Sequence, residues 1–392
     1  MDRQLKNYEI LKDRADIERL RQFWTPCQTH RDTDIDFYLF IAEHYVDVLS
    51  PCVIAVYRDG QPTAIVVGRL ENKPLEVKIG YLRFRTPRLR TLTLLHGCVV
   101  GHLSEEDENN VVARMLDFLR SGEATVIRFE AIDTKSSLYA RAKTAPSFLC
   151  SDHFPNLTTH YGRSCDHGKK SFMDSLSYRP RHNYRSSAKR LHEAFPGKVR
   201  IEHFDDITSI DRLVEDAETV ASKTYQRALG VGFSNSNRVR QRLEFEARKN
   251  WLRSYVLYIE EKPCAFCIGT LYRGTFYVEF IGYDELYAKY SVGMYLVINA
   301  FNDLSDSSRK DRASKIDFGP GEGVWKATLS SYSWQEASVL IFAPTIGGLC
   351  INCFRSAMAA INQNAKKLLT KAGLLTRIKK LWRTHAAPPS SR

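Results

Sequence analysis

One stretch of the chain, residues 276–334, constrains the fold more than any other. Alternating side chains at its start predict a β-strand, and the apolar spacing after Gly293 predicts a helix. A second strand is expected to end at Asp317, before a glycine-rich turn that reaches Lys326. A helix that starts directly after a strand exposes N–H groups without internal partners and the positive end of its dipole. We therefore expect this stretch to bind a phosphate or a developing oxyanion.

Both halves of the chain show the same order of predicted elements. In the first half, a hairpin turns at Asp59-Gly60, and a helix over residues 104–122, with acids in its first turn, lies between two strands. In the second half, three strands over residues 254–284 form a meander that the helix and strand described above continue. The repetition is one of pattern rather than of sequence identity. It predicts a mixed α/β fold built from two similar halves.

The net charge of +12 indicates an anionic partner, which is a nucleic acid, a membrane surface or an anionic ligand. The charge is uneven, because no acidic residue follows Glu336 and residues 177–200 form a second basic stretch. The sequence has no apolar run of about 18 or more residues, so no membrane-spanning helix is expected. Its first residues lack the apolar core of a signal peptide, which predicts a cytoplasmic protein.

Nine scattered cysteines are typical of a reducing compartment rather than of a disulfide scaffold. Two pairs, Cys264–Cys267 and Cys350–Cys353, have the CxxC spacing found in zinc sites. The first pair lies in a predicted strand rather than in the tight turn of a zinc knuckle. We therefore expect buried cysteines and no metal.

Four segments of the second half together resemble a known enzyme family. They are KTYQRALGVGF at 223–233, KPCAFCIG at 262–269, YDELYAKYSVG at 283–293 and DFGPGEGVWK at 317–326. Their order and spacing resemble the GNAT-fold acyltransferases of the FemAB-like group, which includes CelD-like acetyltransferases associated with cellulose biosynthesis. The resemblance covers about residues 175–335 in sequence and the first half only in architecture. Val292 departs from it, because the family often has Pro there.

The resemblance implies tandem GNAT-like domains, each with a mixed, largely antiparallel sheet flanked by helices. The expected organisation is an N-terminal domain at 1–165, an acyl-donor-binding domain at 166–345, and a basic amphipathic helical tail at 346–392 with a disordered end. The implied co-substrate is acetyl-CoA or another acyl-CoA, without a metal.

The resemblance also implies a donor site and a catalytic set. The N–H groups expected to hold the donor's pyrophosphate belong to Ser291, Val292, Gly293 and Met294. Lys326 is expected to stabilise charge on the thioester or the acceptor. Asp317 is expected to anchor the glycine turn, act as a base or pair with Lys326, with anchoring favoured. Tyr290 is expected to reprotonate the thiolate or to line the acceptor pocket. The plainer alternatives are a glycine that only starts a helix, a solvated surface lysine and a core tyrosine.

The acceptor is expected to meet side chains from the same region. They are Glu279, Tyr283, Asp284 and Tyr287, together with Arg185 from the basic stretch. The tyrosines line the acceptor pocket or pack in the core. Arg185 faces an anionic acceptor or the adenosine phosphate of CoA, or belongs to a solvated helix face.

These expectations favour an acyltransferase that moves an acetyl or acyl group from acyl-CoA to an amine or hydroxyl by direct attack. By family association, the acceptor is a small molecule or a sugar or envelope precursor. One alternative keeps the fold but takes aminoacyl-tRNA as donor. Another is a non-catalytic basic protein that binds a membrane or nucleic acid, although nucleic acid is the less favoured partner.

The tail after Cys350 alternates apolar residues with lysine and arginine, as around Ile361 and Leu368. Such a helix lies on anionic lipid or packs on the domain with its cations in water. Packing is favoured, and lipid contact would place the protein at the inner face of the membrane.

Overall fold

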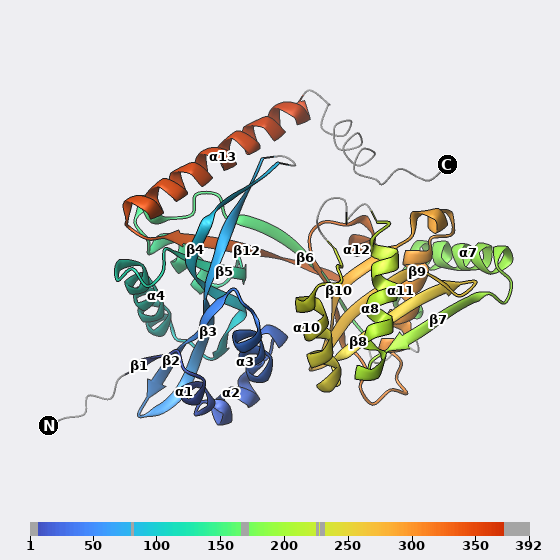
Figure 1. Ribbon diagram of the computed structural model, residues 1–392, viewed down its shortest axis with the longest axis horizontal. Coiled ribbons are helices and arrows are strands. Elements are labelled where there is room, and N and C mark those ends of the chain that lie inside the picture. The colour runs from blue at the N-terminus through green and yellow to red at the C-terminus, as the bar shows by residue number, and fades with distance from the viewer. Residues whose placement is uncertain (1–6, 80–81, 166–171, 225–226, 228–231, 372–392) are drawn as a thin grey trace. The chain divides into compact units, whose positions relative to one another are not determined.

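A computed structural model describes residues 7–79, 82–165, 172–224, 227 and 232–371 (Figure 1). The chain divides into two compact units. Among the described residues, unit 1 comprises 7–158 and 335–371 and unit 2 comprises 159–334, with the gaps given above. Within these ranges the chain passes between the units twice, after Thr158 and after Trp334. The domain limits expected from the sequence, at 165 and 345, remain a prediction about how the chain is organised.

Unit 1 is a mixed sheet with helices on its faces. Its strands, in spatial order, are β1 (Tyr8–Leu11), β2 (Val48–Arg58), β3 (Gln61–Ile79), β4 (Leu82–Gly101), β5 (Val126–Asp133) and β12 (Tyr332–Phe342). Its helices are α1 (Arg14–Glu18), α2 (Arg21–Cys27), η1 (Arg31–Thr33), α3 (Ile35–His44), α4 (Glu105–Arg120), α5 (Ser137–Thr144), η2 (Phe148–Cys150) and α13 (Ile346–Lys371). β4 and β5 pair in parallel, and the other neighbours whose register is known pair antiparallel.

Unit 2 has the same plan. Its strands, in spatial order, are β7 (Val199–Phe204), β8 (Leu252–Ile259), β9 (Lys262–Tyr272), β10 (Thr275–Tyr283), β11 (Lys315–Pro320) and β6 (Asn156–Ser164). Its helices are α6 (Phe172–Ser175), α7 (Tyr178–Ala194), η3 (Ile207–Ser209), α8 (Ile210–Ala221), α10 (Asn237–Arg248), η4 (Glu285–Tyr290), α11 (Val292–Leu304) and α12 (Val324–Leu329). Here β10 and β11 are the parallel pair.

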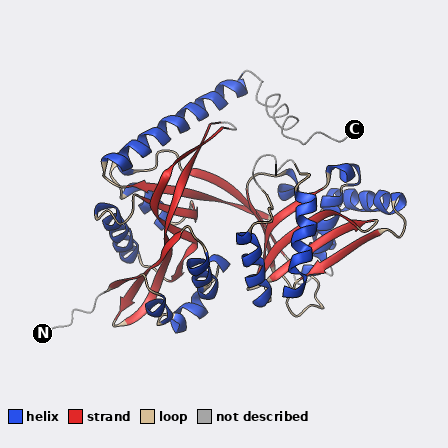
Figure 2. Ribbon diagram, viewed as in Figure 1, coloured by secondary structure: helices blue, strands red, loops and turns tan. Residues whose placement is uncertain are grey.

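The main elements of the two units follow the same order along the chain; Figure 2 shows the helices and strands of both. Each has an antiparallel meander, β2-β3-β4 or β8-β9-β10, then a crossover helix, α4 or α11, and a parallel strand, β5 or β11. In each, the last strand of the sheet comes from the other half of the chain: β12 completes unit 1 and β6 completes unit 2. The predicted duplication of a mixed α/β architecture is therefore confirmed.

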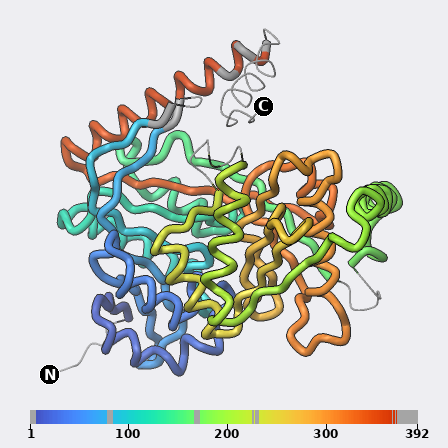
Figure 3. The backbone as a smooth tube through the Cα atoms, turned by 45° about the vertical axis from the view of Figure 1, so that its right-hand side comes forward, coloured from blue at the N-terminus to red at the C-terminus, as the bar shows by residue number. Residues whose placement is uncertain are grey.

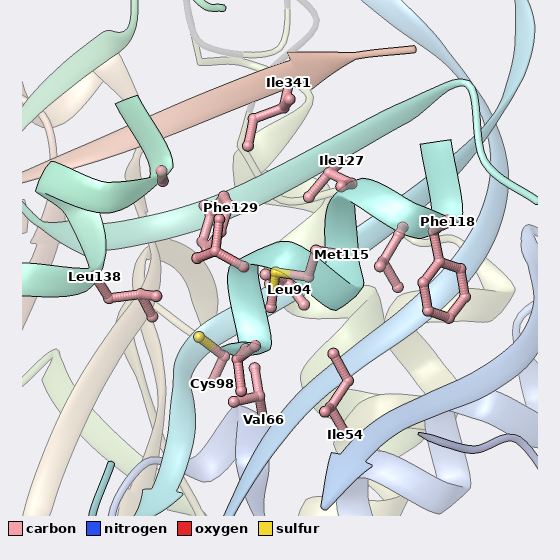
Figure 4. Close-up of a cluster of buried hydrophobic side chains, with 14 of the residues drawn as sticks. Ile54, Val66, Leu94, Cys98, Met115, Phe118, Ile127, Phe129, Leu138 and Ile341 are labelled. Carbon is pink, nitrogen blue, oxygen red and sulfur yellow. The ribbon is translucent and has the colours of Figure 1, made fainter. Parts of the chain in front are cut away.

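Apolar side chains of the crossover helices hold the two sheets. In unit 1, Met115 and Phe118 of α4 belong to one buried cluster with Leu94 and Phe129 of the sheet (Figure 4). In unit 2, Phe301 of α11 packs among sheet aromatics in the same way. Each helix thus buries one face on the parallel strand pair, which fixes where its first turn begins.

Helix α13 extends unit 1 beside the long β3–β4 hairpin, as Figures 1 and 3 both show. The Asn352 amide donates to the carbonyls of Leu149 and Ser151, and Arg355 pairs with the fully buried carboxylate of Asp152. The first half of the predicted tail therefore packs on its unit. Residues 372–392, the predicted disordered end among them, lie outside the described residues. No helix in the described ranges is long and apolar enough to cross a bilayer.

Candidate active site

The first turn of α11 has neither a side-chain cap nor an acid, whereas the first turn of α4 has both. No side chain caps α11, and its first turn contains no acid; Ser291 precedes it in the left-handed region, with φ 56° and ψ 39°. In α4, Ser104 and Asp107 form a capping box, and four acids occupy the first turn. Because the units correspond, only unit 2 presents uncapped N–H groups and an unopposed dipole end at this position.

Gly293 has a packing role as well as a proposed binding role. A Cβ at this position would stand 2.9 Å from Cδ1 of the Tyr283 ring, which lies across the helix. Val292 and Gly293 are both buried. The absence of a side chain at Gly293 therefore already has a structural explanation: it lets the end of β10 lie against the first turn of α11.

The parallel strands beside this helix separate after a short contact. Thr275 to Tyr277 of β10 pair with Lys315 to Asp317 of β11, and the recorded register stops there. β10 continues to Tyr283 while pairing with β9, and a bulge between Val278 and Phe280 makes Glu279 the extra residue. The β10 edge from residue 278 onward is therefore not matched to β11, and its peptide groups suit an extended ligand.

The glycine turn after β11 is held by two charged side chains. Asp317 accepts a hydrogen bond from the Gly319 N–H at 2.8 Å, which is the anchoring contact expected from the sequence. Lys326 Nζ donates to the carbonyls of Gly319 at 3.1 Å and Pro320 at 2.8 Å. Both charges are thus engaged with the backbone of the turn.

Lys326 also lies where the strands separate. A Cβ on Gly319 would stand 3.4 Å from the Val278 carbonyl oxygen and 4.0 Å from Lys326 Nζ. Burial lowers the pKa of Lys326, and the nearby negative charge of Asp317 opposes that shift. Gly319 therefore has both the Lys326 ammonium and the Val278 carbonyl near it, and the ammonium lies in a partly desolvated setting, where a cation acts more strongly than in water.

The acids expected to meet the acceptor are paired with cations. Glu279 lies 2.9 Å from the Arg242 guanidinium. Asp284 is buried, pairs with Lys223 Nζ at 2.8 Å and accepts the Leu286 N–H as the cap of η4. Asp284 therefore has an evident structural role at the junction of β10 and η4.

The remaining predicted residues are dispersed around α7 and η4. Tyr287 and Tyr290 pack edge-on against Phe195, with ring centroids 6.1 Å and 5.2 Å away. Burial raises the pKa of Tyr287. Arg185 is exposed on α7. Lys326 and Asp317 thus both bind the backbone of the glycine turn, and the Tyr283 ring packs on Gly293. Tyr287 and Tyr290 both pack on Phe195.

One residue near the turn was missed by the sequence argument. His160 of β6 is buried, lies opposite Pro320 in the register, and has Nδ1 3.9 Å from the Asp317 carboxylate. Its ring contacts Trp334 at 5.1 Å. Residues 156–164 had been expected in the first domain, and only the β6–β11 pairing reveals this neighbour.

Comparisons with known proteins agree with this architecture. Residues 179–327 match the sequence model of an acetyltransferase (GNAT) domain. A comparison with curated protein sequences found no match. A tandem GNAT protein from the clavulanic acid biosynthesis pathway superposes with a TM-score of 0.54 at 9% identity, covering 86% of this chain and 99% of that one.

Two further solved structures are similar at lower scores. FemX has a TM-score of 0.49 at 10% identity, covering 74% of this chain and 88% of its own. The C-terminal domain of a putative lysylphosphatidylglycerol synthetase from Agrobacterium fabrum has a TM-score of 0.49 at 11% identity, covering 88% and 95%. The resemblance to GNAT acyltransferases is thus confirmed at the level of the domain and the fold: residues 179–327 of unit 2 match a GNAT acetyltransferase domain, and the fold of the chain resembles that of a tandem GNAT protein.

Proposed function

We propose that unit 2 binds acyl-CoA and transfers its acyl group to an amine or hydroxyl acceptor. One observation carries the proposal: α11, which follows β10 and the short helix η4, begins with no side-chain cap and no acid in its first turn, whereas its counterpart α4 is closed by its own carboxylates. The N–H groups of Val292, Gly293 and Met294 would hold the pyrophosphate. Each charge-assisted hydrogen bond contributes about 1.5–3 kcal/mol, so three form a substantial anchor.

The extended pantetheine arm fits the unmatched edge of β10. Its two amides alternate donors and acceptors as a strand does, and residues 278–283 offer the complementary peptide groups. Running from α11 toward Val278, the arm would bring the thioester to the point where the strands separate. This places the reacting carbonyl near Lys326 and the glycine turn.

The reaction is direct attack. The acceptor nitrogen or oxygen bonds to the thioester carbon, the C–S bond breaks, and the acceptor's proton passes to the leaving thiolate. Lys326 donates two of its three N–H groups to the turn and has one left for the oxyanion. We assign Asp317 to holding the turn. Tyr290 directly precedes Ser291, at the pyrophosphate end of the donor in this pose, so the proton passes to the thiolate without Tyr290. Glu279, Tyr283, Asp284, Tyr287 and Arg185 stay proposed acceptor contacts.

The test places a negative charge where the pyrophosphate is expected. Ser291→Asp keeps a residue type that tolerates the left-handed conformation and adds a carboxylate at the α11 start. Its control, Ser291→Asn, has the same size without the charge. Calorimetric titration should show CoA binding weakened at least tenfold by Asp and little changed by Asn. Absence of CoA and acetyl-CoA binding up to millimolar concentration would reject the proposal.

Aminoacyl-tRNA is the alternative donor within the same fold. It would use the basic surface of the chain, so its binding should fall steeply with salt. Titration of charged tRNA beside acetyl-CoA separates the two donors. A sugar or envelope precursor is the proposed acceptor class.

We also propose that α13 contacts an anionic membrane from the cytoplasmic side. Ile346, Phe354, Ile361 and Leu368 fall within one helical stripe and are 84%, 45%, 50% and 67% exposed. No acid occurs after Glu336. Two copies of this helix would bring like charges together, whereas anionic lipid complements them, so lipid is the favoured occupant.

A further inference from the structure

A second cluster of reactive side chains lies in unit 1, away from the elements of the acyl-transfer site. His30, Asp32 and His96 each offer one ligand atom, and these three atoms lie within 4.8 Å of one another. Glu336 of β12 lies beside this group, with Oε1 3.1 Å from His96 Nε2. The four residues come from the start of η1, from β4 and from β12, so the fold rather than local sequence brings them together.

The backbone is shaped to bring the two imidazoles together. In the β3–β4 register, Val66 pairs with Val99 but Gly68 pairs with Leu94, so the residues between form a wide bulge in β4. His96 lies in this bulge, and Gly97 follows it with φ +67°. A Cβ on Gly97 would stand 2.6 Å from Cβ of His30. Only glycine lets the bulge close on η1.

The resulting set has the chemistry of a divalent transition-metal site. The His30 and His96 rings lie 4.1 Å apart between centroids, with the carboxylates of Asp32 and Glu336 beside them. Two neutral imidazoles and two carboxylates form a ligand set that suits Zn²⁺ and balances its charge. The Glu336 side chain is 5% exposed and that of His96 24%, which leaves an entry from solvent.

We propose that unit 1 binds one Zn²⁺ ion through His30, Asp32, His96 and Glu336. Tetrahedral ligands at about 2.0–2.1 Å from zinc lie about 3.3 Å from one another. The 3.1 Å separation of His96 and Glu336 is already close to that value. His30 Nδ1 accepts the Asp32 N–H at 3.2 Å, and zinc binding gives up that hydrogen bond.

The ion would have a structural role. Glu336 is the second residue of the segment that returns to unit 1, and it pairs with Asp133 of β5. Four protein ligands close the coordination sphere, as in structural zinc sites. Zinc would thus fasten the start of β12 to the β4 bulge and to η1. The inference does not depend on the acyl-transfer proposal.

The experiment uses untagged full-length protein, stripped with chelator and titrated with Zn²⁺ by calorimetry. One equivalent should bind and raise the melting temperature. His96→Ala and Glu336→Gln should each lower the zinc affinity at least tenfold and abolish the thermal shift. His102→Ala, an exposed histidine of the same unit, should leave both unchanged.

The exposed pair Cys350 and Cys353 is the main competitor for zinc and needs its own control. The double variant C350S/C353S should retain full binding. In the unaltered protein, Co²⁺ should give a tetrahedral visible spectrum without thiolate charge-transfer bands, and X-ray absorption should detect two imidazoles. Failure to bind one equivalent of Zn²⁺, or loss of binding in the cysteine variant alone, would overturn the proposal.

Discussion

The ring of Tyr283 occupies the space that a side chain on Gly293 would need, with 2.9 Å between Cδ1 and the position of the missing Cβ. Gly293→Ala should therefore destabilise unit 2. Overpacking costs about 1–3 kcal/mol, and the low end is expected because Tyr283 is 37% exposed and is able to move aside. Urea unfolding measures the change.

Combining this change with Tyr283→Ala separates packing from donor binding. If Gly293 serves packing alone, Gly293→Ala/Tyr283→Ala should bind CoA as Tyr283→Ala does. If the helix backbone must approach the pyrophosphate closely, the double variant should bind CoA more weakly than Tyr283→Ala does. If Gly293→Ala, Tyr283→Ala and the double variant all bind CoA with equal affinity, Gly293 does not belong to the donor site.

Lys326 should give the reaction an alkaline limit. Because its pKa is lowered, its protonated form is lost at a pH below that of an ordinary lysine. The rate constant kcat/KM should therefore fall as pH rises through this lowered pKa. Lys326→Arg should shift the fall to higher pH, and Lys326→Met should cost about 100–1,000-fold at neutral pH. A pH profile that is identical in all three proteins would contradict an electrostatic role.

Asp311 should contribute stability that acid removes. Burial acts to raise its pKa, but hydrogen bonds from Arg253 and Arg309 lower it to about 2. A lowered carboxyl pKa gives stability that is present above the unfolded value and lost as pH falls toward about 2. Urea unfolding of unaltered protein and Asp311→Asn should therefore converge as pH falls through this range.

Removing the Asp311 carboxylate leaves the buried Arg253 guanidinium without this ion-pair partner. Arg253 is 1% exposed, whereas the Asp311 side chain is 39% exposed, so Asp311→Ala should destabilise unit 2 by about 1–3 kcal/mol. Replacing both partners, as Arg253→Met/Asp311→Ala, should recover part of the loss. If the double variant loses as much stability as Arg253→Met and Asp311→Ala together, the two residues are not coupled.

The exposed stripe of α13 should control lipid binding. Phe354→Glu, Ile361→Glu and Leu368→Glu, combined, should abolish sedimentation with vesicles that contain anionic lipid, and neutral vesicles should bind neither protein. Gln363→Glu, an exposed position off the stripe, is a partial control for added charge. A change from dimer to monomer in the triple variant, without lipid binding in either protein, would identify a second copy as the occupant instead.

Local patterns were sufficient for the elements around the site. The alternation in β10, the apolar face of α11 and the Asp317–Gly319 turn each depend on neighbours in sequence, and the structure has them where the patterns indicated. The helix begins at Val292, two residues earlier than the predicted start at Met294. Local periodicity also showed that the two halves repeat.

Contacts between strands that are far apart in the sequence could not be predicted from local patterns. His160 reaches Asp317 because β6 pairs with β11, and no spacing in the sequence encodes this pairing. The zinc-binding candidates His30 and His96 meet only because β4 bulges at Gly97. The acids in the first turn of α4 were visible in the sequence. Only the structural correspondence between α4 and α11 shows that these acids close the α4 start to an anion, because the α11 start has no such acids.

The exchange of β6 and β12 between the halves imposes an order on synthesis. Unit 1 lacks an outer strand until residue 342 has left the ribosome, although most of its sheet is made from residues before 134. Its β5 edge would stay unpaired during translation of the whole second half, and open strand edges promote aggregation. Unit 2 receives β6 before its other strands are made. The nascent chain should therefore complete its second unit first, and fragments cut near residue 165 should be poorly soluble.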